Sequence, residues 1–386
     1  MTRAERLLAP DVARGLSLLG IVLANCVGFV SGSELGPLMR PVDGSTADRV
    51  VDAVVGLFVD NRAFPMFTML FAYGYVSVLR RQEAAQVPWP RARALLLRRS
   101  LALCGFGAAH LLLLFAGDIL LPYGLLGIAL VLVVRAGDRA LRLLGWATLP
   151  VFLGLGALDG LGEAQPATAP TYLSDLLERL TLLAGTVLGA PFYVAALAPA
   201  AVVGALLARS RVLEDPAAQL PLLRRAVLLG LPVSVLGAVP LVLVATRVLD
   251  APLPVRVLLA ALHGGTGLLG AAAFLAGVGW WAAGQERRHG GGAPRRGAVR
   301  ALAAVGERSL SCYLLQSVLL VPLLSPWALG VAEGAGTALV SAVAVGVYLV
   351  TVVVAALLDR AGRRGPAEVL LRRMVYGAGP STTGRA

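Results

Sequence analysis

Ten long apolar stretches, most of them near the length needed to cross a lipid bilayer, dominate this sequence. A hydrocarbon core roughly 30 Å thick takes about 20 residues of helix, and backbone groups inside it must be paired within the segment. The stretches are 13–30, 53–79, 98–116, 119–134, 141–161, 182–207, 226–248, 255–282, 302–324 and 335–358. We therefore predict an all-α fold, a polytopic integral membrane helical bundle of about ten transmembrane helices.

The arginines predict the orientation of this bundle. All 34 basic residues are arginine, and cytoplasmic loops retain an excess of Lys and Arg during insertion. With a cytoplasmic N-terminus, 28 arginines fall in cytoplasmic segments, five fall outside and Arg62 lies within a span. We predict that both termini are cytoplasmic and that the chain is a multi-pass protein of a bacterial plasma (inner) membrane.

Composition excludes several other classes of protein. Only 15% of the residues are charged, against about a quarter in soluble proteins. The net charge of +12 lies between the spans, and with 6% aromatic residues no basic face carries the stacking side chains of single-strand binders, so we predict no nucleic-acid partner. An all-arginine basic set is typical of a GC-rich, actinobacterial-like genome. The three cysteines and three histidines lack metal-ligand spacing, so no metal site is predicted.

The domain organisation is expected to be simple. Residues 1–386 are predicted to form a single transmembrane helical domain, with a flexible cytoplasmic linker at 285–300 and a disordered tail at 377–386. The second stretch is interrupted by Asp60-Asn61-Arg62, so its span is expected to begin near Ala63. Glycines within the apolar stretches are expected to be helix-packing positions.

Ionisable side chains inside a bilayer are expensive and mark function or an internal pair. Asp11 and Arg14 stand at the entrance of the first stretch, with the i,i+3 spacing that lets them pair on one helix face. One interpretation is a helix start followed by a positive-inside anchor. The other makes Arg14, with Asp11, a ligand for a phosphate of a lipid or nucleotide-bearing donor.

His110 and Asp118 form a second candidate. His110 lies well inside the third stretch and Asp118 just beyond its end. A neutral imidazole oriented by a carboxylate is the usual arrangement of a general base. The alternative is a histidine bonded to a neighbouring backbone carbonyl, with Asp118 capping the next helix.

Four further polar residues are candidates for substrate binding. Arg62, beside Asn61, would clamp a carboxylate or phosphate, or would pair with Asp60 or Asp118. His263 and Gln316 lie in later spans, and His263 alone is equally explained as a packed histidine. The predicted topology places His110, Asp118, Arg62 and His263 at similar depth in the outer half of the bundle.

Several motifs resemble the YeiB-like membrane family, which is a family of unknown function. Residues 11–21, together with Asn25 at the end of the motif, resemble its opening signature. The segment from His110 to Gly127, which contains Gly117-Asp118-Ile119-Leu120, resembles its most distinctive block. Residues 309–317 and 365–377 resemble its penultimate helix and closing motif. Around 61–68 the chain departs from the family's Gly-Lys-Phe-Arg-like stretch, and Arg62 stands in for the usual basic residue.

The resemblance extends distantly to transmembrane acyltransferases with an Asp-x-x-Arg-Gly opening and an intramembrane histidine. It implies transfer of an acyl group from a cytoplasmic thioester to an extracytoplasmic envelope lipid, glycan or metabolite. His110 would activate the acceptor, Asp118 would orient His110, Arg62 or His263 would polarise the carbonyl, and Arg14 would face the donor's phosphates. No tightly bound cofactor is expected; the donor would be of the acyl-CoA type.

Two rival hypotheses remain open. In a transporter or lipid flippase the same polar residues would form a substrate or proton site, and Pro232 and Pro240 would mark a broken helix. A non-catalytic envelope scaffold is the third hypothesis. The expected partners are membrane lipids and a small-molecule, lipid or glycan substrate, with a homodimer as an open alternative to a monomer.

Overall fold

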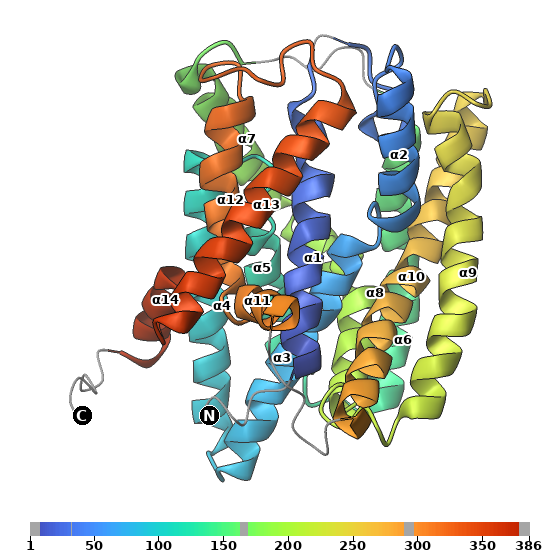
Figure 1. Cartoon of the computed structure of the whole chain (residues 1–386). Coiled ribbons are helices and arrows are strands. Elements are labelled where there is room, and N and C mark those ends of the chain that lie inside the picture. Colours follow the sequence, from blue (N-terminus) through green and yellow to red (C-terminus); the bar gives the residue numbers. More distant parts are fainter. Residues whose placement is uncertain (1–7, 32, 163–168, 289–296, 378–386) are drawn as a thin grey trace.

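The computed structural model describes residues 8–31, 33–162, 169–288 and 297–377. Over these ranges the chain is built from α-helices and short 3-10 turns, and no β-strand is present. Long helices run roughly side by side along one axis, as a membrane bundle requires (Figure 1). The protein is therefore an all-α polytopic helical bundle.

Eight segments of the described chain are long and apolar enough to cross a membrane. They contain α1 (Leu8–Cys26), α2 (Thr46–Phe58) joined to α3 (Ala63–Ala84), α4 (Trp89–Leu113), α6 (Asp138–Ala157), α8 (Ala190–Arg209), α9 (Leu220–Ala245), α10 (Leu253–Arg288) and α13 (Thr337–Arg360). Of the two shorter apolar helices, α5 (Leu120–Val133) coincides with the fourth apolar stretch. The ninth stretch, 302–324, is instead divided between the end of α11 (Gly297–Glu307) and α12 (Ser309–Leu324). All ten stretches thus become helices, while the number that cross the bilayer and the side of each terminus stay predictions.

The second apolar stretch breaks where its polar residues lie. α2 ends at Phe58 and α3 begins at Ala63, as the sequence predicts. Asn61, between them, has φ of 57°, a left-handed conformation that Asn tolerates better than other non-glycine residues. The turn brings the polar side chains of residues 60–62 into the interior of the bundle.

Two segments expected to be loops contain helix starts. α2 begins at Thr46, where Ser45 and Asp48 form a reciprocal capping box. α7 (Tyr172–Leu188) begins after Thr171, which makes the same reciprocal bonds with Ser174. The stretch expected over 182–207 is therefore divided between α7 and α8. Such caps supply hydrogen bonds to helix-end N–H groups, and apolar periodicity does not detect them.

Of the predicted linker 285–300, the first four residues continue α10 and the last four lie in α11 (Gly297–Glu307). Residues 289–296, and all of the predicted tail except Gly377, lie outside the described ranges. The start of α1, the end of α13, and α14 (Pro366–Tyr376) lie toward the same end of the bundle (Figure 1).

Small residues bring the helices close together, as predicted for the glycines within the apolar stretches that form α9 and α10. A Cβ atom on Gly237 would overlap the side chain of Thr266, and one on Gly270 would overlap Ser234. Gly306 of α11 similarly lies against the backbone carbonyl of Asp11. Close backbone approach is the usual way in which helices associate within lipid, where apolar side chains gain little from leaving the solvent.

Candidate functional site

A cavity of about 950 Å³ opens at the end of the bundle where α1 begins. Its walls come from α1, α3, α4, the start of α5, the loop after α8, and α11, α12 and α14. Exposed Arg81 and Arg372 lie at its rim, whereas Tyr123 and Tyr313 are fully buried at its inner end. Its volume is at the upper end of the range found for pockets that hold drug-sized ligands.

The cavity wall is rich in positive charge. Seven arginines line it, against four carboxylates. The arginines are Arg14, Arg80, Arg81, Arg99, Arg211, Arg364 and Arg372.

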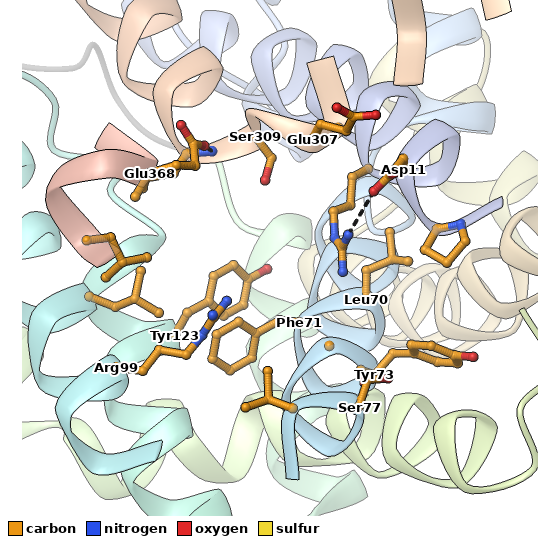
Figure 2. A pocket seen from close by; sticks show the side chains of 18 of the residues that line it. Asp11, Leu70, Phe71, Tyr73, Ser77, Arg99, Tyr123, Glu307, Ser309 and Glu368 are labelled. Atoms are coloured by element: carbon orange, nitrogen blue, oxygen red, sulfur yellow. Dashed lines mark hydrogen bonds and ion pairs between the residues drawn. The ribbon is translucent and has the colours of Figure 1, made fainter. Parts of the chain in front are cut away.

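Internal contacts account for all four carboxylates, and Glu307 is paired with Arg300 at 3.1 Å. Asp11 pairs with Arg14 at 3.3 Å, as the i,i+3 spacing predicts, and Glu214 accepts two hydrogen bonds from Arg80. Glu368 accepts bonds from backbone N–H groups at the start of α12. Arg99, in contrast, has no carboxylate partner within the described residues and extends into the cavity toward Phe71 and Tyr123 (Figure 2). The cavity therefore has unneutralised positive charge suited to an anionic ligand.

His110 lies beyond the inner end of this cavity, behind Tyr313. The ring centroids of His110 and Tyr313 are 5.0 Å apart. The Tyr313 hydroxyl accepts a 3.3 Å bond from the N–H of Ile119, the residue that follows Asp118. Ile119, Leu120 and Tyr313 all line the cavity. Tyr313 thus lies both in the cavity wall and against the imidazole.

The imidazole is held between a carboxylate and a hydroxyl. His110 Nδ1 is 2.7 Å from Asp118 Oδ1, and His110 Nε2 is 2.8 Å from Ser317 Oγ on α12. The side chains of His110 and Asp118 are completely buried. Asp118 Oδ2 also accepts a 2.7 Å bond from the N–H of Leu121, so the carboxylate caps α5 as well as orienting the imidazole. Both predicted roles of Asp118 are therefore present in the geometry.

Gln316, the neighbour of Ser317, is buried beside this group. It is 3% exposed, and its Nε2 has no hydrogen-bond partner within the described part of the chain. Gln316, Ser317, Tyr313 and Asn25 share the wall of a second, very small cavity of about 10 Å³. A buried amide donor without a partner is costly, and it is available to an oxygen atom entering this space.

Arg62 lies in a different cluster, at the turn between α2 and α3. It is 1% exposed and donates to the backbone carbonyls of Asp60 and Ser234 and to the hydroxyl of Ser234. Its Nη1 is also 2.8 Å from His263 Nε2. The guanidinium therefore holds the α2–α3 turn against α9 and α10, and it does not pair with Asp118.

Asn61 extends this second cluster. Its amide nitrogen donates to Asp159 at 2.7 Å and lies 3.2 Å from His263 Nδ1. Arg40, in the loop before α2, bonds to Asp60 at 2.5 Å and lies near Asp52. Burial by itself would lower the pKa of Arg40, but the adjacent Asp60 and Asp52 carboxylates outweigh it and raise that pKa.

The predicted site residues thus form three groups. Asp11 and Arg14 line the large cavity, His110 and Asp118 lie behind it with Gln316, and Asn61, Arg62 and His263 form the cluster at the helix break. In the described structure, none of the hydrogen bonds of His110 or Asp118 reaches Arg62 or His263, so the expected convergence of those four side chains is divided between two clusters.

Sequence reasoning missed Ser317, Tyr313 and Arg99. Ser317 and Tyr313 belong to the stretch 309–317 already noted for its resemblance, but serine and tyrosine are too common in apolar helices to attract attention there. Arg99 lies at the start of the stretch 98–116, where an arginine is expected simply as a cytoplasmic anchor. Only the fold shows that these side chains approach the cavity or His110.

Comparison with known proteins finds similarity to proteins whose descriptions assign no activity. Residues 207–378 match the family described as "Protein of unknown function (DUF418)". The chain is 33% identical to "Uncharacterized protein YxaH" of Bacillus subtilis (strain 168), over 37% of this chain and 36% of that protein. It is 31% identical to "Uncharacterized protein YeiB" of Escherichia coli (strain K12), over 47% of this chain and 46% of that protein.

The chain therefore spans less than half the length of the curated relatives it matches. No solved structure matches it. The descriptions of these relatives name no substrate and no acyltransferase activity. Together, the DUF418 match over residues 207–378 and the 31% identity to YeiB make this protein similar to YeiB-like proteins of unknown function over about half of its length.

Proposed function

We propose that this protein is a transmembrane acyltransferase that moves an acyl group from a thioester donor of the acyl-CoA type to an envelope lipid, glycan or exported metabolite. The observation that carries the proposal is the cavity of about 950 Å³ that leads from exposed arginines to Tyr313, whose ring lies 5.0 Å from that of His110 in the buried His110–Asp118 pair. An acyltransferase needs such a path between a charged donor and a proton acceptor.

The arginine-lined part of the cavity suits the donor. A coenzyme A thioester carries phosphates at one end and an uncharged acyl group at the end of a long arm. Arg14 and Arg99 would bind the phosphates by charge-assisted hydrogen bonds, and the apolar and aromatic wall formed by Leu70, Phe71 and Tyr123 would surround the arm. Arginine-rich segments face the cytoplasm in most membrane proteins, so the donor would enter from that side.

The His110–Asp118 pair suits the transfer step. A carboxylate that accepts the Nδ1 proton fixes the tautomer in which Nε2 has a free lone pair. That nitrogen can take a proton from an oxygen or nitrogen nucleophile as it attacks the thioester carbonyl. Seclusion from lipid and water would limit hydrolysis of the donor.

The test uses the full chain reconstituted in proteoliposomes with radiolabelled acyl-CoA esters of increasing chain length. We expect label to enter an envelope lipid or glycan fraction extracted from the same bacterium, and His110→Ala to abolish that transfer. The proposal is wrong if no chain length yields transfer and a deletion strain has unchanged envelope lipids and glycans.

A transporter is the second candidate, and the α2–α3 break is the observation that favours it. Transporters often bind ions or substrates where a membrane helix is interrupted, and here the interruption contains buried Arg62, His263 and Asn61. The broken helix expected at Pro232 and Pro240 is not observed, because α9 continues through both prolines without interruption. Solute uptake that survives His110→Ala but is lost in His263→Ala would favour transport.

A further inference from the structure

Ser317 is placed as a nucleophile would be, not merely as a polar neighbour of His110. From Asp118 Oδ1 to His110 Nδ1 the distance is 2.7 Å, and from His110 Nε2 to Ser317 Oγ it is 2.8 Å. The acid contacts one ring nitrogen and the hydroxyl contacts the other, which is the arrangement of a Ser-His-Asp triad. The three residues come from α4, the turn before α5, and α12, so only the tertiary fold assembles them.

The hydroxyl of Ser317 is not satisfied by its own helix, in contrast to several other buried hydroxyls of this bundle. Ser17, Ser100 and Thr351 each donate to the carbonyl four residues earlier in their own helix, which is the usual way in which a helix satisfies such a group. Within the described residues, the sole hydrogen bond of Ser317 is the one to His110. In the tautomer whose Nδ1–H donates to Asp118, Nε2 is the acceptor, and the Ser317 hydroxyl proton would point to the nitrogen that removes it.

We infer that Ser317 forms a covalent acyl-serine intermediate, with Gln316 as the donor that stabilises the oxyanion. This inference rests on the proposed acyltransferase function and specifies its mechanism as two successive transfers. The Gln316 amide supports it, because its Nε2 is buried without a partner and shares a small cavity with Ser317. Acyl-transfer sites need a preorganised donor at the point where negative charge develops on the carbonyl oxygen.

The first transfer acylates the serine. His110 Nε2 removes the hydroxyl proton as Ser317 Oγ attacks the thioester carbonyl carbon, giving a tetrahedral intermediate. The carbon–sulfur bond then breaks, and the imidazolium returns the proton to the departing thiolate. The products are an ester on Ser317 and the free thiol of the donor.

The second transfer releases the acyl group. An acceptor hydroxyl or amine loses its proton to His110 Nε2 and attacks the ester carbonyl. The carbon–oxygen bond to Ser317 breaks, and Oγ recovers the proton from the imidazolium. Asp118 keeps its charge throughout and acts as a positioning residue, which the bond from the Leu121 N–H favours.

Access to Ser317 requires Tyr313 to turn. Ser309, Leu310 and Tyr313 of α12 line the large cavity, and Ser317 lies one helical turn beyond Tyr313 on the same helix. Tyr313 lines both the large cavity and the small one. A thioester arm that displaces the Tyr313 ring would reach Ser317 directly.

The experiment begins with a fluorophosphonate probe, which reacts with activated serines and does not depend on the identity of the acyl donor. The full chain in detergent is treated with the probe, and labelled peptides are mapped by mass spectrometry. We expect labelling at Ser317, loss of at least about a hundredfold in labelling rate in His110→Ala, and no labelling in Ser317→Ala.

Ser341→Ala is the matched control, because Ser341 is a buried serine on the neighbouring α13, 6% exposed like Ser317. The Ser341→Ala protein should be labelled at Ser317 at the same rate as the wild type. Wild-type protein that remains unlabelled at Ser317 overturns the inference. If Ser317→Ala does not fold, Ser317→Cys replaces it, and mapping of iodoacetamide adducts at position 317 shows whether the side chain remains reactive and dependent on His110.

The acyl-CoA esters then separate the inference from the proposed function. Without acceptor, the wild type should release one thiol per chain in a burst and hold one acyl group on Ser317, whereas Ser317→Ala should lose transfer by at least about a thousandfold. Transfer that persists in folded Ser317→Ala but not in His110→Ala overturns the covalent step and leaves the acyltransferase standing. Labelling of Ser317 by the fluorophosphonate without acylation by any acyl-CoA supports the nucleophile and overturns the proposed donor.

Discussion

Replacing Arg62 by methionine tests whether the buried cluster at the α2–α3 break is structural. Methionine keeps most of the side-chain length but donates no hydrogen bond. The Asp60 carbonyl and the Ser234 hydroxyl would lose their guanidinium partner, and each buried acceptor left unpaired costs about 1–3 kcal/mol. Part of this lost free energy is regained because the buried guanidinium charge, which is costly to desolvate, is also removed. We expect a net loss of about 3 kcal/mol in the free energy of unfolding.

That loss can be converted into a melting temperature. An unfolding entropy of about 2 cal/mol/K per residue over 386 residues predicts that Tm falls by roughly 4 °C. Differential scanning fluorimetry of the detergent-solubilised chain measures it. Arg225→Met is the control, since Arg225 is an exposed residue of α9, and such substitutions stay within about 0.5 kcal/mol. Equal Tm values for Arg62→Met and Arg225→Met would refute the structural role and favour Arg62 as a substrate ligand.

Three more predictions concern the cavity and the packing around it. Asp118→Asn should lower the turnover number for acyl transfer by about 10⁴-fold with the fold retained, as shown by transfer kinetics beside circular dichroism. Arg99→Ala should raise the KM for acyl-CoA by about tenfold through loss of a charged hydrogen bond, whereas Arg98→Ala, at the exposed neighbouring position outside the cavity wall, should leave it unchanged. Gly306→Ala should destabilise the chain by about 1–3 kcal/mol because its Cβ would overlap the Asp11 carbonyl, while Gly346→Ala, with open space around it, should not lower Tm.

The bundle was predictable because hydrophobicity along a chain directly reports burial in lipid. Every apolar stretch became helical, including the short one at α5, although three of the ten are divided between two α-helices. The helix starts at Thr46 and Tyr172 were missed, since Ser45 and Thr171 act through local capping bonds that contribute nothing to hydropathy. Segment existence is thus set by composition, whereas segment ends are set by individual hydrogen bonds.

The candidate site was only partly predictable. His110 and Asp118 lie eight residues apart, so their pairing could be inferred from local sequence. Ser317 lies 207 residues after His110, and no local pattern indicates which face of α12 meets α4. The depth argument placed His263 near His110, but depth along the bundle axis does not specify position around it. His263 instead meets Arg62 across the α2–α3 turn.

The attachment of the last described helix bears on how mutations at the end of the chain would act. Glu368 of α14 receives the N–H groups of Leu310 and Ser311, and the Ser311 hydroxyl in turn accepts a bond from the Ala367 N–H. Ser311 and Ser317 are six residues apart on α12, about 9 Å along the helix axis. A premature stop codon ahead of Glu368 would remove the hydrogen bonds that hold the first turn of α12 against α14. Such a truncation should therefore have the same effect as a substitution at His110, although the deleted residues lie at the surface end of the bundle.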